Sequence, residues 1–402
     1  MNYYQISYSD LDGRKRSECF QFSSYDKLES FFQKHHFKLF KTKEISRKAF
    51  LRDLNTTNQI TEAEMIEIIS HLHIMVKAGL PLPASLRDLA LDSKKTQIKK
   101  VFYFLSNSIE NGNSLSSSLE YMHKLFGFST IYLIRIGEET GTLAQTLKKA
   151  KEFLIQSVAL KTRVKLALIY PLTVFFVAFV AIVLWFTFVL PQMAEMFTSM
   201  DLELPWLTRA LIFISDIVSH SYLYVIVFVF IIVMTVWQAQ KRSSEIRKIV
   251  HLQVLKIPFV GKIIRDVNVA YITEFLSLSI STGTSLFKAI KLIGDNINNS
   301  VYQESLRKVA VHLENGLSFS SALQKEKIYN AFTIRMLNIG EHSGDLESQL
   351  YTISQYYNHN VESSTTEMTK IIEPAMIIFV GIVFALIMLG LIGPVFEIVA
   401  TI

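Results

Sequence analysis

Three long runs of apolar residues set the pattern of this chain. Residues 166–190 and 372–396 are almost wholly apolar over 25 residues each, and residues 222–237 form a shorter apolar run with polar residues on both sides. About 20 apolar residues in a helix are enough to cross the hydrocarbon core of a bilayer. Helices of soluble proteins seldom lack a polar stripe over such a length. The pattern therefore predicts three transmembrane helices, over residues 166–191, 221–239 and 371–396.

Basic residues lie almost entirely on one side of these predicted spans. Of the 41 lysines and arginines, only Arg209 falls between the first two spans, and none follows the third. Loops rich in Lys and Arg stay in the cytoplasm. Residues 1–20 contain no apolar stretch typical of a signal peptide. We therefore expect a cytoplasmic N-terminus, a periplasmic loop over 192–220 with an amphipathic helix, a cytoplasmic segment over 240–370, and a periplasmic tail over 397–402.

The two segments predicted to be cytoplasmic resemble each other in sequence. The matching blocks are residues 76–82 and 280–286, 110–119 and 314–323, and 136–143 and 339–346. The offset between them is 203 or 204 positions throughout, and it also pairs Pro171 with Pro374. A constant offset over such a distance indicates a duplication rather than chance.

Each copy has the pattern of a small multi-helix bundle. Apolar residues recur at helical spacing, and glycines suited to a left-handed helix end follow at Gly79 and Gly283 and again at Gly112 and Gly316. Ser117 with Glu120, and Ser321 with Gln324, match the spacing of a capping box. We expect about six helices in each bundle, the first over residues 59–165 and the second over 240–370.

A second glycine pattern recurs in both copies as Gly-Glu-x-x-Gly or a close variant of it. The glycines are Gly137 and Gly141 in the first copy, and Gly340 and Gly344 in the second. Glycine lowers helix stability and permits tight turns, so we expect these glycines to break the helix that contains them.

The N-terminal residues 1–46 follow a different pattern. Tyr4, Ile6 and Tyr8 alternate with polar residues, Asp12-Gly13 suits a tight turn, and residues 18–22 alternate again. This pattern predicts a β-hairpin. A helix over Ser24–His36 and a third strand over Phe37–Phe40 complete a small α+β domain, followed by a polar linker over residues 47–58. The predicted fold class is a mainly α polytopic membrane protein with two duplicated helical bundles.

Composition excludes several functions. Half the residues are hydrophobic, 19% are charged, and the formal net charge is +6. We attribute that charge to membrane topology rather than to direct nucleic-acid binding. The single cysteine, Cys19, excludes an intrachain disulfide and a zinc site built on several cysteines.

No catalytic, cofactor or metal site is predicted. Gly261-Lys262 is the only Gly-Lys pair, and the glycine and hydroxyl residue of a phosphate-binding loop are missing around it. His71 and His73 lie two residues apart and would point about 200° away from each other on a helix, so they cannot share an ion. Any ATP hydrolysis must therefore be carried out by a partner.

Three acidic residues are candidates for a partner contact or an interface. Glu138 and Glu341 lie in the two glycine motifs, and Glu373 lies at the membrane edge of the third predicted span. The motif glycines Gly137, Gly141, Gly340 and Gly344 belong to the same candidate set. The alternative for Glu138 and Glu341 is a favourable charge near a helix start. Glu373 can also simply reach water at the membrane edge.

Pro171 and Pro374 open their predicted spans. Proline is common in the first turn of a helix, where its missing N–H is of little consequence, so we favour helix initiation over a mechanical hinge.

The order of these motifs resembles the bacterial type II secretion system F protein family, which includes platform proteins of type IV pilus assembly. The resemblance is carried by Val76–Leu82, the two glycine–glutamate blocks, Tyr170-Pro171, Val189–Pro191, Leu204-Pro205 and Ile372–Pro374. Two positions depart from the family pattern: Thr284-Ser285 replaces an apolar–proline pair, and His342 replaces an acidic residue.

The resemblance implies an inner-membrane platform that couples a cytoplasmic hexameric ATPase to pilins or pseudopilins. It also implies a homodimer or higher oligomer, contacts with other inner-membrane assembly proteins and with membrane lipids, and no catalysis. Pilus, secretion and competence machines all remain possible settings. A transporter or permease subunit is the main alternative, and a membrane enzyme or sensor is a further one.

Overall fold

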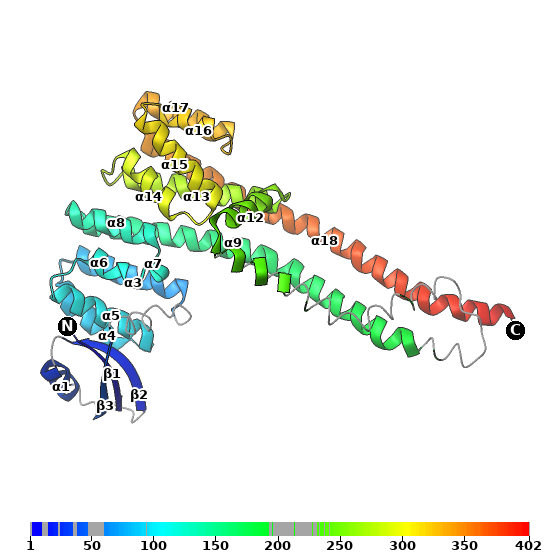
Figure 1. Ribbon diagram of the computed structural model, residues 1–402, viewed down its shortest axis with the longest axis horizontal. Coiled ribbons are helices and arrows are strands. Elements are labelled where there is room, and N and C mark those ends of the chain that lie inside the picture. Colours follow the sequence, from blue (N-terminus) through cyan, green and yellow to red (C-terminus); the bar gives the residue numbers. More distant parts are fainter. Residues whose placement is uncertain are drawn as a thin grey trace. The chain divides into compact units, whose positions relative to one another are not determined.

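The computed structural model describes residues 2–9, 15–22, 25–34, 38–46, 60–93, 95–192 and 242–401, with a few isolated helical positions between 195 and 240 (Figure 1). The chain divides into two compact units. The first unit contains Met1–Ala159, Tyr271–Ile297 and Ser305–Ser354, and the second contains Leu160–Ala270, Asn298–Glu304 and Gln355–Ile402.

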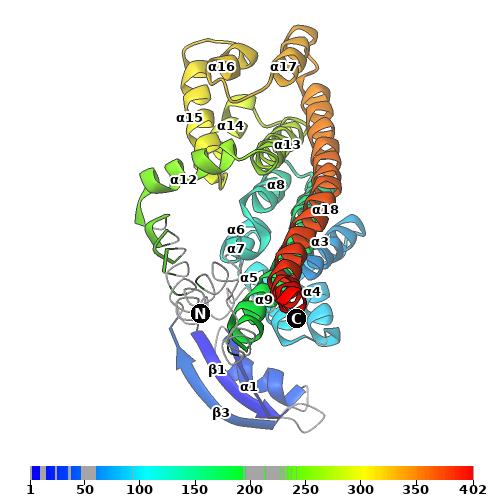
Figure 2. The ribbon, with the colours of Figure 1, turned by 90° about the vertical axis from the view of Figure 1, so that its right-hand side faces the viewer.

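The N-terminal segment forms a three-stranded antiparallel sheet with one helix beside it (Figure 2). Its elements are β1 (Asn2–Ser9), β2 (Lys15–Phe22), α1 (Tyr25–Lys34) and β3 (Lys38–Ile45), in sheet order β2-β1-β3. The pairing of β1 with β2 confirms the predicted hairpin. Tyr8 of β1 packs edge-to-face on Phe32 of α1, with ring centroids 5.2 Å apart. The third strand is longer than predicted, because it continues past Phe40 to Ile45 along β1. The predicted linker over residues 47–58 lies outside the described residues.

The first copy of the duplicated segment begins with six short helices. They are α3 (Glu62–Lys77), α4 (Leu82–Asp92), α5 (Thr96–Glu110), α6 (Leu115–Glu120), α7 (His123–Phe126) and α8 (Phe128–Glu139). A long helix, α9 (Leu143–Leu184), follows directly. Thr61 and Glu64 form a capping box at the start of α3, in which the Glu64 carboxylate accepts a 2.8 Å hydrogen bond from the Thr61 N–H.

The second copy repeats this order except that no helix corresponds to α7, since residues 326–330 form turns and bends. It contains α13 (Val260–Ile280), α14 (Leu286–Asn296), α15 (Ser300–Glu314), α16 (Phe319–Lys325), α17 (Ala331–Ser343) and the long α18 (Leu346–Thr401), and α12 (Ser244–Lys256) precedes it. His73 Nδ1 lies 2.9 Å from the Ala144 carbonyl oxygen, and Ser277 Oγ donates over 3.0 Å to the Glu347 carbonyl. These two contacts join equivalent positions, so α3 meets α9 as α13 meets α18.

Glycines end the helices where the sequence predicts it. Gly79, Gly283, Gly112 and Gly316 have φ angles of +68°, +87°, +83° and +81°. Only glycine adopts this left-handed conformation without steric cost, which explains the same residue at the same place in both copies.

Among the described residues, two helices are long and apolar enough to cross a membrane. They cover Leu172–Gln192 and Leu346–Ala385. The first includes a π-helical turn, η2 (Trp185–Val189). The second predicted span, 221–239, falls largely outside the described residues, as does the predicted loop over 192–220. Three spans are therefore not established by the structure.

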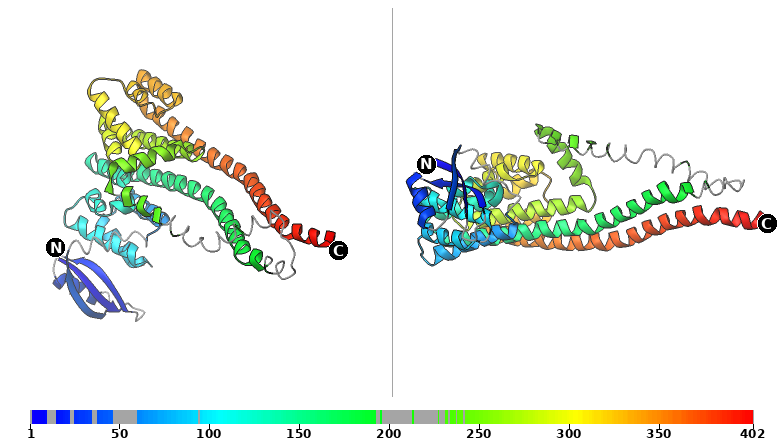
Figure 3. Two further views of the ribbon diagram at one scale, coloured as in Figure 1. Left: turned by 45° about the vertical axis from the view of Figure 1, so that its right-hand side comes forward. Right: turned by 90° about the horizontal axis from the view of Figure 1, so that it is seen from below.

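Pro171 and Pro374 do not initiate their helices. Both lie in the interior of a continuous helix, α9 or α18 (Figure 3, green and orange to red). A proline within a helix removes the hydrogen bond to the carbonyl four residues earlier, here that of Ala167 or Lys370. Helix initiation is therefore the wrong interpretation. α9 has already begun at Leu143 and α18 at Leu346, and a mechanical hinge at either proline stays a prediction.

Candidate functional site: the duplicated glycine–glutamate motif

Glu138 links two helices of the first copy. It lies near the end of α8, and its carboxylate accepts hydrogen bonds from the backbone N–H groups of Leu115 at 2.5 Å and Ser116 at 2.9 Å. These are the first residues of α6, whose N–H groups have no partner within the helix and carry partial positive charge. Glu138 therefore completes the start of a helix that precedes it by more than 20 residues.

Glu341 does the same in the second copy. Its carboxylate accepts from the N–H of Phe319 and, at 3.2 Å, from the N–H of Ser320, and the Ser320 hydroxyl donates to it as well. The duplicated glutamate thus ties α17 to α16 as Glu138 ties α8 to α6.

The serines that cap these two short helices differ from the predicted ones. Ser114 Oγ accepts from the Ser117 N–H at 3.1 Å, and Ser318 Oγ accepts from the Ser321 N–H at 3.3 Å. The predicted caps, Ser117 and Ser321, lie three residues too late. The reason is that the acidic member of each cap comes from a neighbouring helix and not from Glu120 or Gln324, so the local spacing was misleading.

The first glycine of each motif permits a close helix contact. Gly137 lies inside α8, where an added Cβ would stand 2.8 Å from Thr146 Cβ and 3.0 Å from Leu143 Cα. In the second copy the Cβ at Gly340 would stand 3.1 Å from Leu346 Cα. The prediction that these two glycines break their helices is wrong, because they instead let one helix touch the start of the next.

The last glycine of each motif ends the helix as predicted. Gly141 and Gly344 both have a φ of +71°. Together the motif residues join a compact helical module to the long helix that follows it. The carboxylates of Glu138 and Glu341 are engaged within the fold, so a partner would meet the surface they shape. Glu373 is exposed on α18. The partner contact itself stays a prediction.

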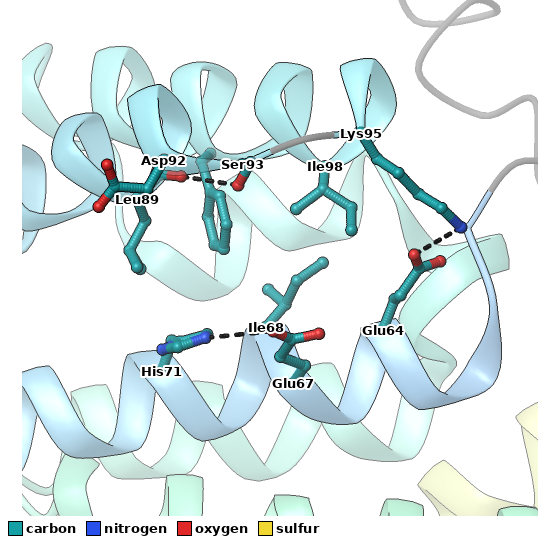
Figure 4. A pocket seen from close by; sticks show the side chains of 10 residues that line it. Glu64, Glu67, Ile68, His71, Leu89, Asp92, Ser93, Lys95 and Ile98 are labelled. Atoms are coloured by element: carbon teal, nitrogen blue, oxygen red, sulfur yellow. Dashed lines mark hydrogen bonds and ion pairs between the residues drawn. The ribbon is translucent and has the colours of Figure 1, made fainter.

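A charged pocket of about 420 Å³ lies between α3 and the helices α4 and α5 of the first copy (Figure 4). Lys95 Nζ lies 2.6 Å from Glu64 Oε1, and the hydrogen bonds from Lys95 and Thr61 hold the pKa of Glu64 below its ordinary value. His71 Nε2 lies 3.6 Å from Glu67 Oε1. The pocket walls are Glu64, Glu67, Ile68, His71, Leu89, Asp92, Ser93, Lys95, Ile98 and Phe102.

The charged side chains that line this pocket are not repeated in the second copy. The positions equivalent to its charged and histidine side chains are Asn268, Tyr271, Phe275, Asn296 and Asn299. His71 faces the pocket, whereas His73 contacts the Ala144 carbonyl, so the two histidines point apart as predicted.

A buried junction joins the two copies within the first unit. The hydroxyl groups of Tyr271 and Ser129 lie 2.8 Å apart, and the Tyr271 ring lies 5.2 Å from that of Phe153. Glu274 is only 4% exposed and faces the side-chain amide of Gln156, whose nitrogen would lie 3.1 Å from Glu274 Oε2 if the amide were turned over. Burial raises the pKa of Glu274 to about 8.

Sequence reasoning missed this junction. Its residues come from helices more than 100 positions apart, and Glu274 looks like an ordinary polar position on α13. The one available signal was that Tyr271 and Phe275 replace the Glu67 and His71 of the first copy, which indicates that this face of α13 is covered. Asp266 is a second buried acid on the same helix, and burial raises its pKa to about 6 despite the nearby Lys262 and Arg265.

Comparison with known proteins agrees with this duplicated architecture. The model of the family described as type II secretion system (T2SS), protein F, matches residues 68–191 and 272–394, one match in each copy. The chain belongs to this family.

Curated relatives cover most of the chain. A type IV pilus assembly protein PilC of Thermus thermophilus is 27% identical over 82% of this chain and 81% of its own length. The PilC of Pseudomonas aeruginosa is 24% identical over 87% and 94%. A type II secretion system protein F of Aeromonas hydrophila is 25% identical over 83% and 86%.

Proposed function

We propose that this protein is the membrane platform of a type IV pilus or type II secretion machine. In this role it couples a cytoplasmic assembly ATPase to the polymerisation of pilins or pseudopilins. The names of the relatives support the assignment to one of these two machines. The observation that carries the coupling is that each helical module runs without interruption into a long apolar helix.

The two long helices suit the transmission of movement. α9 has 42 residues and α18 has 56, which at 1.5 Å per residue gives lengths of about 60 and 80 Å. The motif holds the start of each helix, because Gly137 and Gly340 lie directly against it. A displacement of the module is therefore carried along a helix rather than lost in a flexible linker.

The proposal assigns ATP hydrolysis to a partner, since the sequence has no phosphate-binding loop around Gly261-Lys262. The rival function, a permease subunit, has less support. Residues 172–192 contain no ionisable group that could line a path for a polar solute.

The proposal includes a location. The module-bearing segments would lie in the cytoplasm, with the N-terminus inside, the C-terminus in the periplasm, and the protein in the bacterial inner membrane. It would act as a homodimer or higher oligomer beside other inner-membrane assembly proteins. The distribution of lysine and arginine supports this orientation, because almost all of them lie in the segments proposed to be cytoplasmic.

Deletion of the gene, with complementation, tests the proposal. The deletion strain should lose surface pili, secretion of type II substrates or DNA uptake, while its assembly ATPase stays present and active in extracts. The full chain in nanodiscs should bind that ATPase. Intact filaments, secretion and uptake in the deletion strain would refute the platform function, and solute flux through liposomes containing the pure protein would favour the permease.

A further inference from the structure

Helix α12 (Ser244–Lys256) belongs to the second unit, and one of its faces packs against the rest of that unit. Lys248 Nζ lies 2.5 Å from Glu304 Oε2, and the backbone N–H of Ser300 donates to His251 Nδ1 over 3.1 Å. Leu255, on the same face, is buried at 9% exposure. Burial and the neighbouring Arg247 lower the pKa of His251, which keeps the ring neutral and able to accept this bond.

The turn from α12 to α13 fixes the direction of the helix. Arg265 Nη2 donates over 2.8 Å to the Leu255 carbonyl, which lies in the last turn of α12. At Gly261 an added Cβ would come within 2.6 Å of the Leu255 carbonyl carbon, so no larger residue fits there without a shift. The orientation of α12 on this unit is therefore built into the fold.

A second face of α12, beside the packed one, exposes a row of large aliphatic side chains. Ile246, Ile249 and Leu252 recur every three residues and are 40%, 57% and 38% exposed. Ile257 and Phe259, just beyond the helix, are also exposed. Phe259 has a φ of +61°, a left-handed conformation that is sterically unfavourable for a non-glycine residue. The fold leaves Phe259 47% exposed despite this conformation.

Charged residues lie among and beside this apolar row, because Glu245 and Lys256 share its face of the helix and Arg247 lies away from it. Arg242, Arg247 and Lys256 are exposed, and Glu245 is the only acidic residue between Arg242 and Phe259. An aliphatic row on a helix whose charged residues are mostly basic is the pattern of a helix that lies in the interface of an anionic membrane. We propose that α12 is such a helix, with its aliphatic row at the acyl boundary and its basic side chains at lipid phosphates.

The connection to the preceding segment favours lipid over another occupant. The Ser243 N–H donates to the Ala239 carbonyl over 2.9 Å, so the chain reaches α12 by a helical turn from the end of the predicted span over 221–239. Four residues cover at most about 14 Å. If that span lies in the membrane, as the proposed function requires, α12 cannot leave the membrane surface. The inference rests on the proposed function in this respect.

Fluorescence quenching by lipids tests the inference in the full chain. In a Cys19→Ser background, bimane is attached at Ile249→Cys, at Phe176→Cys of α9 and at Val311→Cys of α15, three exposed apolar positions. Each protein is placed in nanodiscs of phosphatidylglycerol or phosphatidylcholine that carry spin-labelled lipid. We expect quenching at 249 to be at least about twofold stronger than at 311 in the anionic discs. Replacing Arg247 and Lys256 by Gln should reduce quenching at 249 and leave it unchanged at 176.

The three positions separate the possible failures. Iodide, a quencher dissolved in the water phase, is added in a second measurement. If lipid quenches the label at 176 but iodide quenches the labels at 249 and 311 equally, the inference is overturned and the platform function is not affected. A site at 249 shielded from both iodide and lipid labels also overturns it, since a second copy or another protein then covers the row. No quenching at 176 refutes the membrane platform and the inference with it.

Discussion

Glu274 offers a sharp test of the junction between the two copies. The residue is only 4% exposed, and this burial raises its pKa from 4.5 to about 8. The raised pKa means that the folded state prefers the protonated form. Its contribution to stability is therefore complete below about pH 4.5 and is lost progressively as pH rises through about 8.

The size of the effect follows from the two pKa values. The difference between a pKa of 4.5 and one of about 8 lowers the free energy of unfolding by about 5 kcal/mol between pH 4 and pH 9. Glutamine has nearly the same shape and does not titrate. Glu274→Gln should therefore be more stable than the natural chain by an amount that grows with pH, and at pH 8.5 the gain in Tm should approach about 10 °C for a unit of this size.

Scanning calorimetry of the detergent-solubilised full chain at pH 5.0 and pH 8.5 measures this difference. Glu67→Gln is the control for the substitution itself, because Glu67 is 64% exposed on α3. A Tm difference between Glu274→Gln and the natural chain that is equal at both pH values would refute the buried-carboxyl account.

Three further outcomes follow from the helix contacts. Gly137→Ala places a Cβ 3.0 Å from Leu143 Cα and should lower stability by about 1–3 kcal/mol in a thermal melt, whereas Gly381→Ala, with nothing within 4 Å, should be neutral or slightly stabilising. Replacing Lys161 and Thr162 in α9 by a Gly-Gly pair should reduce filament assembly or secretion in cells, while an Ala-Ala pair should not; equal activity of both would contradict the role of a stiff helix. His251, whose pKa is lowered, stabilises the fold above about pH 6.5, so the natural chain should lose more Tm than His251→Gln between pH 8 and pH 5.5.

Features set by the local chain were predictable from sequence. The hairpin alternation of β1 and β2 and the helix ends at Gly79 and Gly283 depend on neighbouring residues alone, and the structure confirms them. The duplication was equally visible, because it needs only a comparison of the chain with itself. The family comparison supports it with one match in each copy.

Features set by contacts between helices were not predictable. A glycine that permits close packing, such as Gly137, looks in sequence like a helix breaker. Glu138 looks like a surface charge until α6 is placed against it. Pro171 looks like a helix start, because the preceding module gives no sign in sequence that its last helix continues into the apolar run. Each misreading comes from applying a local rule to a residue whose role is tertiary.

The side of the membrane on which the two modules lie tests the platform most directly. In a Cys19→Ser background, Ile74→Cys of α3 and Val311→Cys of α15 place exposed thiols in the first and second copies. A membrane-impermeant maleimide added to intact spheroplasts should label neither position, and both should react once the membrane is permeabilised. Labelling of position 311 in intact spheroplasts would contradict the account, because the duplicated modules would then lie on opposite sides and could not act together on a cytoplasmic ATPase.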